Sequence, residues 1–303
     1  MRIFQVDAFT RTRFAGNPAS VVLDADGQSE LTLSALAREF AHAEIAFVLA
    51  ATGPDHDVRV RFFNARKEMP FVGHATIAAH AVLLALGRRG AGVMRQSSAG
   101  AVVEVRAGDA PAHTERGGTH FEFRQTVPEL DNPLPLKTTL RVAEALKLPA
   151  TRLHETLPAR IARKGSTRLL VPVADVRSLE ALAPNADTLM SIGQELGADG
   201  FFVFGVSRGA TRGEQLTTES RMFCPALGIA EDPASGNAHA MLASYLFEHG
   251  VLGKQAAGFV GLQGRHMNRP SEIAVRLETE EGELRAAHVG GGAFIVSEGT
   301  LSP

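Results

Sequence analysis

Apolar residues in this chain fall mainly into short runs that have the length and composition of β-strands. These runs cover Arg2–Phe9, Ala19–Leu23, Ile45–Ala50, Val58–Phe63, Ala101–Val105, Phe201–Val206, Glu272–Leu277 and Ala293–Val296. Two longer segments, His74–Leu86 and Asn237–Phe247, are apolar around most of a helix circumference and are followed by glycine, which predicts helices buried on all sides. Shorter helices are predicted at Ser34–Phe40, with Thr32 or Ser34 as its N-cap, at Leu140–Leu148 and at Leu189–Leu196.

One loop motif occurs twice, each time just before a buried helix. Glu68-Met-Pro-Phe-Val-Gly-His-Ala and Glu231-Asp-Pro-Ala-Ser-Gly-Asn-Ala share Glu, Pro, Gly and Ala at the same positions. Each copy follows a strand-like run, Arg61-Phe62-Phe63 or Arg221-Met222-Phe223. Chance similarity in a chain rich in glycine and alanine is the competing interpretation, but the conserved order of strand, loop and helix favours a duplicated fold.

This order predicts an α+β protein rather than a layered βαβ protein. We expect two pseudo-symmetric domains, each a curved mixed β-sheet wrapped around a central apolar helix. Residues 1–118 form the first half-repeat, residues 119–285 form the second, and residues 286–303 contribute a C-terminal strand that packs back on the first domain. The segment 106–120, rich in Gly, Ala, Asp and Thr, is the expected linker.

Composition argues against several classes of function. The 303 residues carry a formal net charge of −2, so no nucleic-acid partner is expected. The apolar runs are too short or too interrupted to span a membrane, and the N-terminal residues alternate as a strand instead of forming a signal core. The single cysteine, Cys224, fits a reducing compartment, and we expect a cytoplasmic protein.

The two loop-to-helix junctions are the first candidate site. Unpaired backbone N–H groups and the helix dipole at a helix start attract carboxylates. Gly73 and Gly236 would let a ligand approach the backbone closely, so two facing junctions could hold a small anion. The alternative is that both glycines only permit tight turns between strand and helix.

Three titratable residues lie near these junctions. Glu44 is flanked by small and apolar residues, so its carboxylate would be partly desolvated and suited to proton transfer, although an exposed acid before a strand is the competing interpretation. His74 follows Gly73 at the helix start, where a structural role is the more common one for histidine. Asp232, in the second loop, could equally be an N-cap or a turn residue. No metal-binding or phosphate-loop spacing is present, so no metal site is expected.

These residues together resemble the PhzF-like family of phenazine-biosynthesis isomerases, within the diaminopimelate-epimerase-like superfamily. The segments that carry the resemblance are Val6–Phe9, Phe14–Ala19, Ala43–Val48, Arg61–Phe63, Glu68–Thr76, Glu231–Ala238 and Gln263–Ser271. The resemblance implies an active site between the two domains, usually in a homodimer, without cofactor or metal. It also implies that Glu44 is the catalytic acid/base, that His74 and Asp232 hold the substrate and assist proton relay, and that Gly73 lines the pocket. We expect Ser235, Gly236 and Asn237 to complete the substrate-binding loop.

The chain departs from the family pattern in its second loop. Ser235 stands where threonine is common and Asn237 where serine is common, which leaves the phenazine substrate open. Asn268 replaces a glycine, and asparagine tolerates left-handed backbone geometry. The loops lack the cysteine pair of the two-base epimerases, and Cys224 lies outside the repeat, so we expect it to be a small buried residue.

The sequence therefore predicts a cofactor-independent isomerase that moves a proton on a small carboxylate-bearing substrate. The family's best-known member isomerises trans-2,3-dihydro-3-hydroxyanthranilate. One alternative is a racemase or epimerase in which Glu44 works with a second carboxylate, Asp232 or Asp199. Another is a relative that binds a small acid without turnover.

Overall fold

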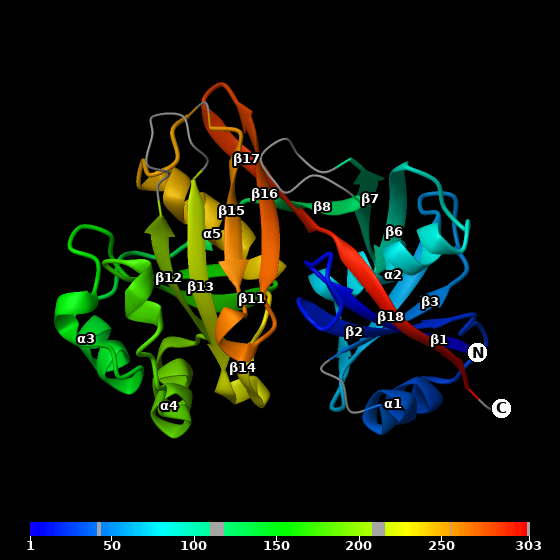
Figure 1. The fold of residues 1–303 in the computed structure, drawn as a ribbon, viewed down its shortest axis with the longest axis horizontal. Helices are drawn as coiled ribbons and strands as arrows, with labels where there is room; N and C mark the ends of the chain where they lie inside the picture. Colours follow the sequence, from blue (N-terminus) through cyan, green and yellow to red (C-terminus); the bar gives the residue numbers. More distant parts are fainter. Residues whose placement is uncertain (41–43, 110–117, 208–215, 255, 302–303) are drawn as a thin grey trace. The chain divides into compact units, whose positions relative to one another are not determined.

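The chain folds into two compact units, which the computed structural model describes over residues 1–40, 44–109, 118–207, 216–254 and 256–301 (Figure 1). The first unit comprises Met1–Arg124 and Gly290–Pro303, and the second comprises Gln125–Val289. Each unit has its own set of paired strands and its own central helix. Part of the expected linker, residues 110–117, lies outside the described residues.

The sheet of the first unit is mixed. Its strands pair in the order β18 (Ala293–Thr300), β1 (Arg2–Ala8), β2 (Asn17–Leu23), β3 (Ile45–Leu49), β4 (Val58–Phe63), β6 (Gly92–Ser98), β7 (Ala101–Gly108) and β8 (His120–Thr126). The pairs β2–β3 and β4–β6 are parallel and the others are antiparallel. The two-residue strand β5 (Glu68–Met69) pairs with β4 and leads into the first loop motif.

The sheet of the second unit repeats this arrangement. Its strands pair in the order β9 (Glu129–Leu130), β10 (Arg160–Lys164), β11 (Ser166–Pro172), β12 (Gly200–Ser207), β13 (Thr217–Cys224), β15 (Gly258–Gln263) and β16 (Ser271–Glu280). The pairs β11–β12 and β13–β15 are parallel, as β2–β3 and β4–β6 are in the first unit. Strand β14 (Ile229–Asp232) pairs with β13 as β5 pairs with β4, and β17 (Glu283–Gly291) follows β16. The duplicated, mixed α+β fold predicted from the repeat is confirmed.

A helix buried almost completely lies at the centre of each unit (Figure 1). In α2 (Gly73–Ala85) every residue from His74 to Leu83 is buried, and α5 (Gly236–Glu248) is buried from Ala238 to Leu246. Helix α2 contacts β1, β2, β3 and β18, while α5 contacts β10 and β16. Both helices were predicted from their apolar circumference, and both are confirmed.

The outer face of each sheet is covered by amphipathic helices. Side chains alternate along β3, so that Ile45 and Phe47 pack with Leu33 of α1 (Glu30–Glu39), whereas Ala46 and Val48 pack with the residues of α2. In the second unit α3 (Leu136–Ala145) and α4 (Ala186–Leu196) pack with β10, β11 and β12 in one core. Short 3₁₀ helices complete the unit: η1 (Ala150–Arg152), η2 (Val176–Leu179), η3 (Pro225–Leu227) and η4 (Arg265–Met267).

Three local predictions were tested by this fold. The predicted start of the first helix is wrong, because α1 begins one turn earlier: the Ser29 hydroxyl accepts a hydrogen bond from the Thr32 N–H and makes Ser29 the N-cap. Asn268 has a φ of 55°, as expected of a residue that replaces glycine. Cys224 is buried at the end of β13, as predicted.

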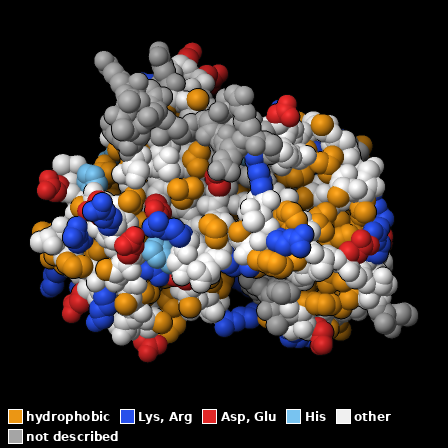
Figure 2. Space-filling view, in the orientation of Figure 1, with side chains coloured by type: hydrophobic (Ala, Val, Ile, Leu, Met, Phe, Trp, Pro, Cys, Tyr) orange, Lys and Arg blue, Asp and Glu red, His pale blue; other side chains and the backbone are white. Residues whose placement is uncertain are grey.

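The surface shows no segregation of charge over the face drawn in Figure 2, where acidic and basic side chains of the described residues lie interspersed. In the described part of the chain, no helix combines the length and the apolar character needed to cross a membrane.

Candidate functional site

An acid and a histidine meet in the first unit. Glu44 immediately precedes β3, and its main-chain carbonyl accepts a hydrogen bond from the Ser20 N–H of β2. Its side chain is only 13% exposed, and its Oε2 lies 3.4 Å from Nε2 of His74. The His74 side chain is 10% exposed and belongs to the first turn of α2. Glu44 is therefore a largely buried carboxylate with an imidazole beside it, rather than an exposed turn acid.

The start of α2 is shaped by a close contact with an aromatic ring. A Cβ atom on Gly73 would lie 2.9 Å from the Phe123 ring, so glycine is required here by packing and not by a positive φ. The N-cap residue, Val72, makes no side-chain hydrogen bond to the helix start. The first backbone N–H groups of α2 lie in the same turn as His74.

The second loop motif forms a tight turn at the start of α5. Asp232 ends β14, and its Oδ1 accepts a hydrogen bond from the Ala234 N–H at 3.3 Å. Ser235 is the N-cap of α5, and its hydroxyl accepts from the Ala238 N–H. Gly236 is the first residue of the helix. Asp232 and Ser235 therefore share one turn, in which the turn role anticipated for Asp232 is realised.

Asn237 is bonded to neighbouring protein groups. Its Oδ1 accepts from Nε2 of Gln125 at 2.5 Å, and its Nδ2 donates to the Ser166 hydroxyl at 2.6 Å. Nδ2 also lies 3.4 Å from the Lys164 carbonyl. A serine at this position would be too short to join Gln125 to the β10–β11 hairpin. The asparagine that departs from the family pattern therefore makes hydrogen bonds that a serine could not make.

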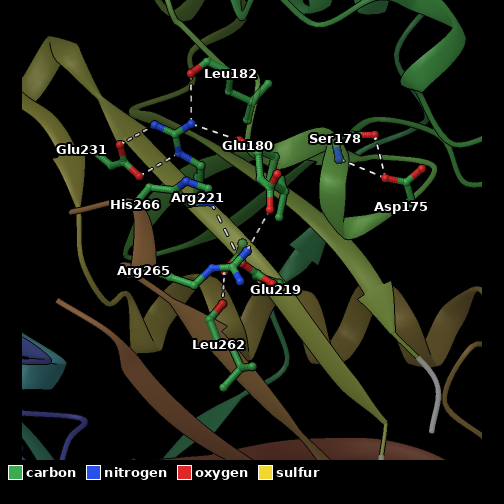
Figure 3. A network of polar contacts seen from close by, with 12 residues as sticks. Asp175, Ser178, Glu180, Leu182, Glu219, Arg221, Glu231, Leu262, Arg265 and His266 are labelled. Atoms are coloured by element: carbon green, nitrogen blue, oxygen red, sulfur yellow. Dashed lines mark hydrogen bonds and ion pairs between the residues drawn. The ribbon is translucent and has the colours of Figure 1, made fainter. Parts of the chain in front are cut away.

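The glutamate that opens each loop motif is held by an arginine that sequence reasoning did not pair with it. Arg221 of β13 donates two hydrogen bonds to Glu231, at 2.9 and 2.7 Å, and two more to the carbonyls of Leu179 and Leu182 (Figure 3). The guanidinium also lies 5.0 Å from the centre of the Phe223 ring.

The first unit contains the same arrangement. Arg61 of β4 donates to Glu68 at 2.8 and 2.6 Å and lies 5.0 Å from the Phe63 ring centre. The signal was present in the sequence, because both arginines stand two residues before a phenylalanine and shortly before the motif glutamate. Two bidentate ion pairs therefore hold the two loop motifs in equivalent positions on their sheets.

Other candidates have structural partners. Asp199 accepts a hydrogen bond from the Thr167 N–H at 2.7 Å and lies near Arg168 at 3.7 Å, with its side chain 46% exposed. This is a hairpin-capping role and not that of a buried base. Among the described residues, no group of three or more His, Cys, Asp or Glu side chains could hold a metal ion.

Comparison with known proteins gives a consistent result. Residues 6–299 match the PhzC-PhzF family model, described as phenazine biosynthesis-like protein. The chain is 34% identical over 298 residues to the uncharacterized isomerase YddE of Escherichia coli O157:H7, covering 97% of this chain and 96% of the relative. It is 30% identical over 301 residues to trans-2,3-dihydro-3-hydroxyanthranilate isomerase of Pseudomonas aeruginosa, covering 98% of each.

Solved structures share the whole fold. A Bacillus anthracis protein of the PhzF family superimposes with a TM-score of 0.86 at 24% identity, covering 100% of this chain and 99% of the other. A predicted epimerase of Pseudomonas aeruginosa superimposes with a TM-score of 0.80 at 29% identity, covering 99% and 98%.

Proposed function

Because the chain belongs to the PhzC-PhzF family of phenazine biosynthesis-like proteins and is an isomerase, we propose that it moves a proton within a small carboxylate-bearing substrate. The observation that carries this proposal is the contact between Glu44 and His74, where a largely buried carboxylate lies 3.4 Å from a largely buried imidazole. A general base benefits from a position shielded from water and from a neighbour that can orient it, and the burial of Glu44 beside His74 supports this role.

In the proposed reaction Glu44 removes a proton from a carbon atom of the substrate and returns it to another carbon of the same molecule. The displaced electron pair shifts the double bond, so the number of protons on the substrate is unchanged. His74 orients the carboxylate of Glu44 through its Nε2. Backbone N–H groups at the start of α2 would bind an anionic group of the substrate, since a helix start favours negative charge.

The loop at the start of α5 supplies further proposed contacts. Asp232 and Ser235 present polar atoms within one turn, and Gly236 is the first residue of the helix that follows. The side-chain amide of Asn237 is already hydrogen-bonded to Gln125 and Ser166, so Asn237 is proposed to act through these two residues and not mainly by contacting the substrate. It would therefore set the shape of the substrate-binding loop.

The first substrate to test is trans-2,3-dihydro-3-hydroxyanthranilate, because the named Pseudomonas aeruginosa relative covers nearly the full length of both chains. Glu44→Gln should lower incorporation of solvent deuterium into this substrate by at least about a hundredfold, the usual scale for loss of a general base. Mass spectrometry measures the exchange, and calorimetry should show binding unchanged within a few fold. Glu39→Gln, at an exposed position of α1, is the matched control and should leave exchange unchanged.

If the Glu44→Gln variant still incorporates solvent deuterium into the substrate, Glu44 is not the general base. Binding without exchange in the unchanged protein would instead indicate a relative that binds a small acid without turnover.

An epimerase is the second candidate, supported by the similarity to the predicted epimerase of Pseudomonas aeruginosa. Such an enzyme inverts one stereocentre and leaves the double bonds in place. Chiral chromatography of the product, combined with its ultraviolet spectrum, separates the two reactions. Inversion without a spectral change would favour the epimerase.

A further inference from the structure

The segment Gln263–Ser271 contains the last motif of the family resemblance, and the proposed chemistry does not use it. It begins with the last residue of β15 and ends with the first residue of β16. Gln263 is only 2% exposed, and both ends of its side-chain amide are bonded to the backbone of the Asp232–Ser235 turn. Its Nε2 donates to the Asp232 carbonyl at 2.6 Å, and its Oε1 accepts from the Ser235 N–H at 3.1 Å. One side chain thus binds the first and last residues of the turn.

Two other residues of the segment hold the middle of the turn. The Ser271 hydroxyl, 4% exposed, donates to the Pro233 carbonyl at 2.9 Å. Gly264 has a φ of 78°, and a Cβ atom there would lie 2.6 Å from the same Pro233 carbonyl. The backbone of the segment therefore approaches the turn as closely as glycine allows.

A buried histidine holds the turn from the helix side. Nδ1 of His239 donates to the Ser235 carbonyl at 2.8 Å, which fixes the ring proton on that nitrogen. Its Nε2 has no hydrogen-bond partner in the described part of the chain and faces Gly261 of β15. The backbone groups of the turn are thus satisfied by Gln263, Ser271 and His239, side chains drawn from three different elements.

We propose that Gln263 is a positioning residue for catalysis, which fixes the turn that carries Asp232 and Ser235 and thereby the start of α5. This inference rests on the proposed function of that loop. Only a side chain with a donor and an acceptor at its end can satisfy both Asp232 O and Ser235 N–H. Gln263 has this pair, and its burial removes water as a substitute for either bond.

Gln263→Glu tests this requirement with almost no change of shape. An ionised glutamate can accept from the Ser235 N–H, but its second oxygen would face the Asp232 carbonyl without a proton between them. A protonated glutamic acid restores the donor. Because the site is buried, the acid form is favoured up to higher pH than in water. The variant should therefore work at low pH and fail at high pH.

The experiment compares this variant with the unchanged protein at each pH. Incorporation of solvent deuterium into trans-2,3-dihydro-3-hydroxyanthranilate is measured between about pH 5 and 9, and the ratio of the two rates cancels titrations common to both proteins. The titratable or charged groups in the elements next to Gln263 include Glu231 and Asp232 on β14, Glu219 and Arg221 on β13, Glu272 on β16, His239 on α5, Arg265 and His266 on η4, and Arg269 beyond it. The ratio should fall about tenfold or more from low to high pH, through kcat more than through KM.

Gln194→Glu on the exposed face of α4 introduces the same charge and should show a constant ratio. A constant ratio for Gln263→Glu would overturn the proposal, because the loss of the donor would then have no effect on the reaction.

A readout that needs no turnover separates this inference from the proposed function. Amide exchange of Ser235, followed by NMR, should be faster in Gln263→Glu than in the unchanged protein at high pH and equal at low pH. If the unchanged protein has no activity on trans-2,3-dihydro-3-hydroxyanthranilate, the proposed function fails, while amide exchange still tests whether Gln263 holds the turn. Equal exchange of the Ser235 amide at every pH would overturn the proposal that Gln263 fixes the Asp232–Ser235 turn.

Discussion

Two buried histidines show how single residues of this fold are fixed by their surroundings. Burial lowers the pKa of His239 to about 4, although its bond to the Ser235 carbonyl acts in the opposite direction. Burial and the neighbouring Arg89 lower the pKa of His80 to about 3. His80 accepts from Arg89 and donates to Gln96, whose amide donates to Thr76 and Ser98. Each central helix therefore contains an imidazole that is neutral when folded.

These histidines should make the protein sensitive to acid. Above pH 6.5 an imidazole is neutral in both folded and unfolded chains, so its contribution to stability is complete. As pH falls from about 6.5 to about 4, the unfolded chain binds a proton that folded His239 does not, and stability falls by on the order of 3 kcal/mol. His239→Gln, which keeps a donor for Ser235, should show a shallower decline in urea unfolding over this range. An equal decline would show that His239 does not contribute.

At the scale of elements, the repeated unit is more than a loop and a helix. In both units an arginine, on β4 or β13, forms a bidentate ion pair with the glutamate of β5 or β14. The same arginine also contacts the ring of the phenylalanine two residues later. The pairs differ in burial. Arg221 and Glu231 are 10% and 15% exposed, whereas Arg61 and Glu68 are 24% and 32% exposed. Arg221 also donates to the carbonyls of Leu179 in η2 and of Leu182.

This difference predicts unequal costs for the same substitution. Arg221→Met leaves the carboxylate of Glu231 and two carbonyls without their donor in a buried site, and should destabilise the protein by about 3 kcal/mol. Arg61→Met at the equivalent position leaves a more exposed carboxylate and should cost about 1 kcal/mol. Chemical denaturation of the two variants gives the comparison. A larger cost at Arg61 would contradict the role assigned to burial.

At the scale of the whole molecule, the first unit is built from both ends of the chain. Strand β18 pairs with β1 from Arg2↔Thr300 to Ala8↔Ala293, with one irregularity near Gln5. Ala293 and Ile295 pack against the core around α2. The second unit is a continuous insertion between these parts. The fold of the first unit therefore depends on residues that follow the second unit in the sequence.

Truncation after Gly292 should expose this dependence. Removal of β18 leaves β1 without one of its two strand partners and opens the core around α2, so amide exchange in β1 and α2 should rise by orders of magnitude. Exchange in β12 of the second unit should change little. Ile295→Val, which removes one methyl group, is the mild control. Uniform loss of protection in both units would show that they fold as one cooperative body.

The local sequence was sufficient to predict much of the fold. The apolar character of His74–Leu86 and Asn237–Phe247 around most of a helix circumference predicted both central helices, because a helix buried on all sides has no polar face. Repetition of the Glu-x-Pro loops predicted the duplicated α+β fold. The start of α1 was wrong by one turn because Ser29, Thr32 and Ser34 are all acceptable caps, and only backbone geometry selects Ser29.

The sequence by itself determined the identity of the repeat, the buried helices and the candidates Glu44, His74 and Asp232, since each depends on residue type and near neighbours. Tertiary structure alone decided which of these meet and what holds them. The register of the first unit places Glu44 3.4 Å from His74, and the return of β15 beside β13 brings Gln263 to the Asp232–Ser235 turn. Contacts between residues so distant along the chain follow from strand pairing, which no local pattern encodes.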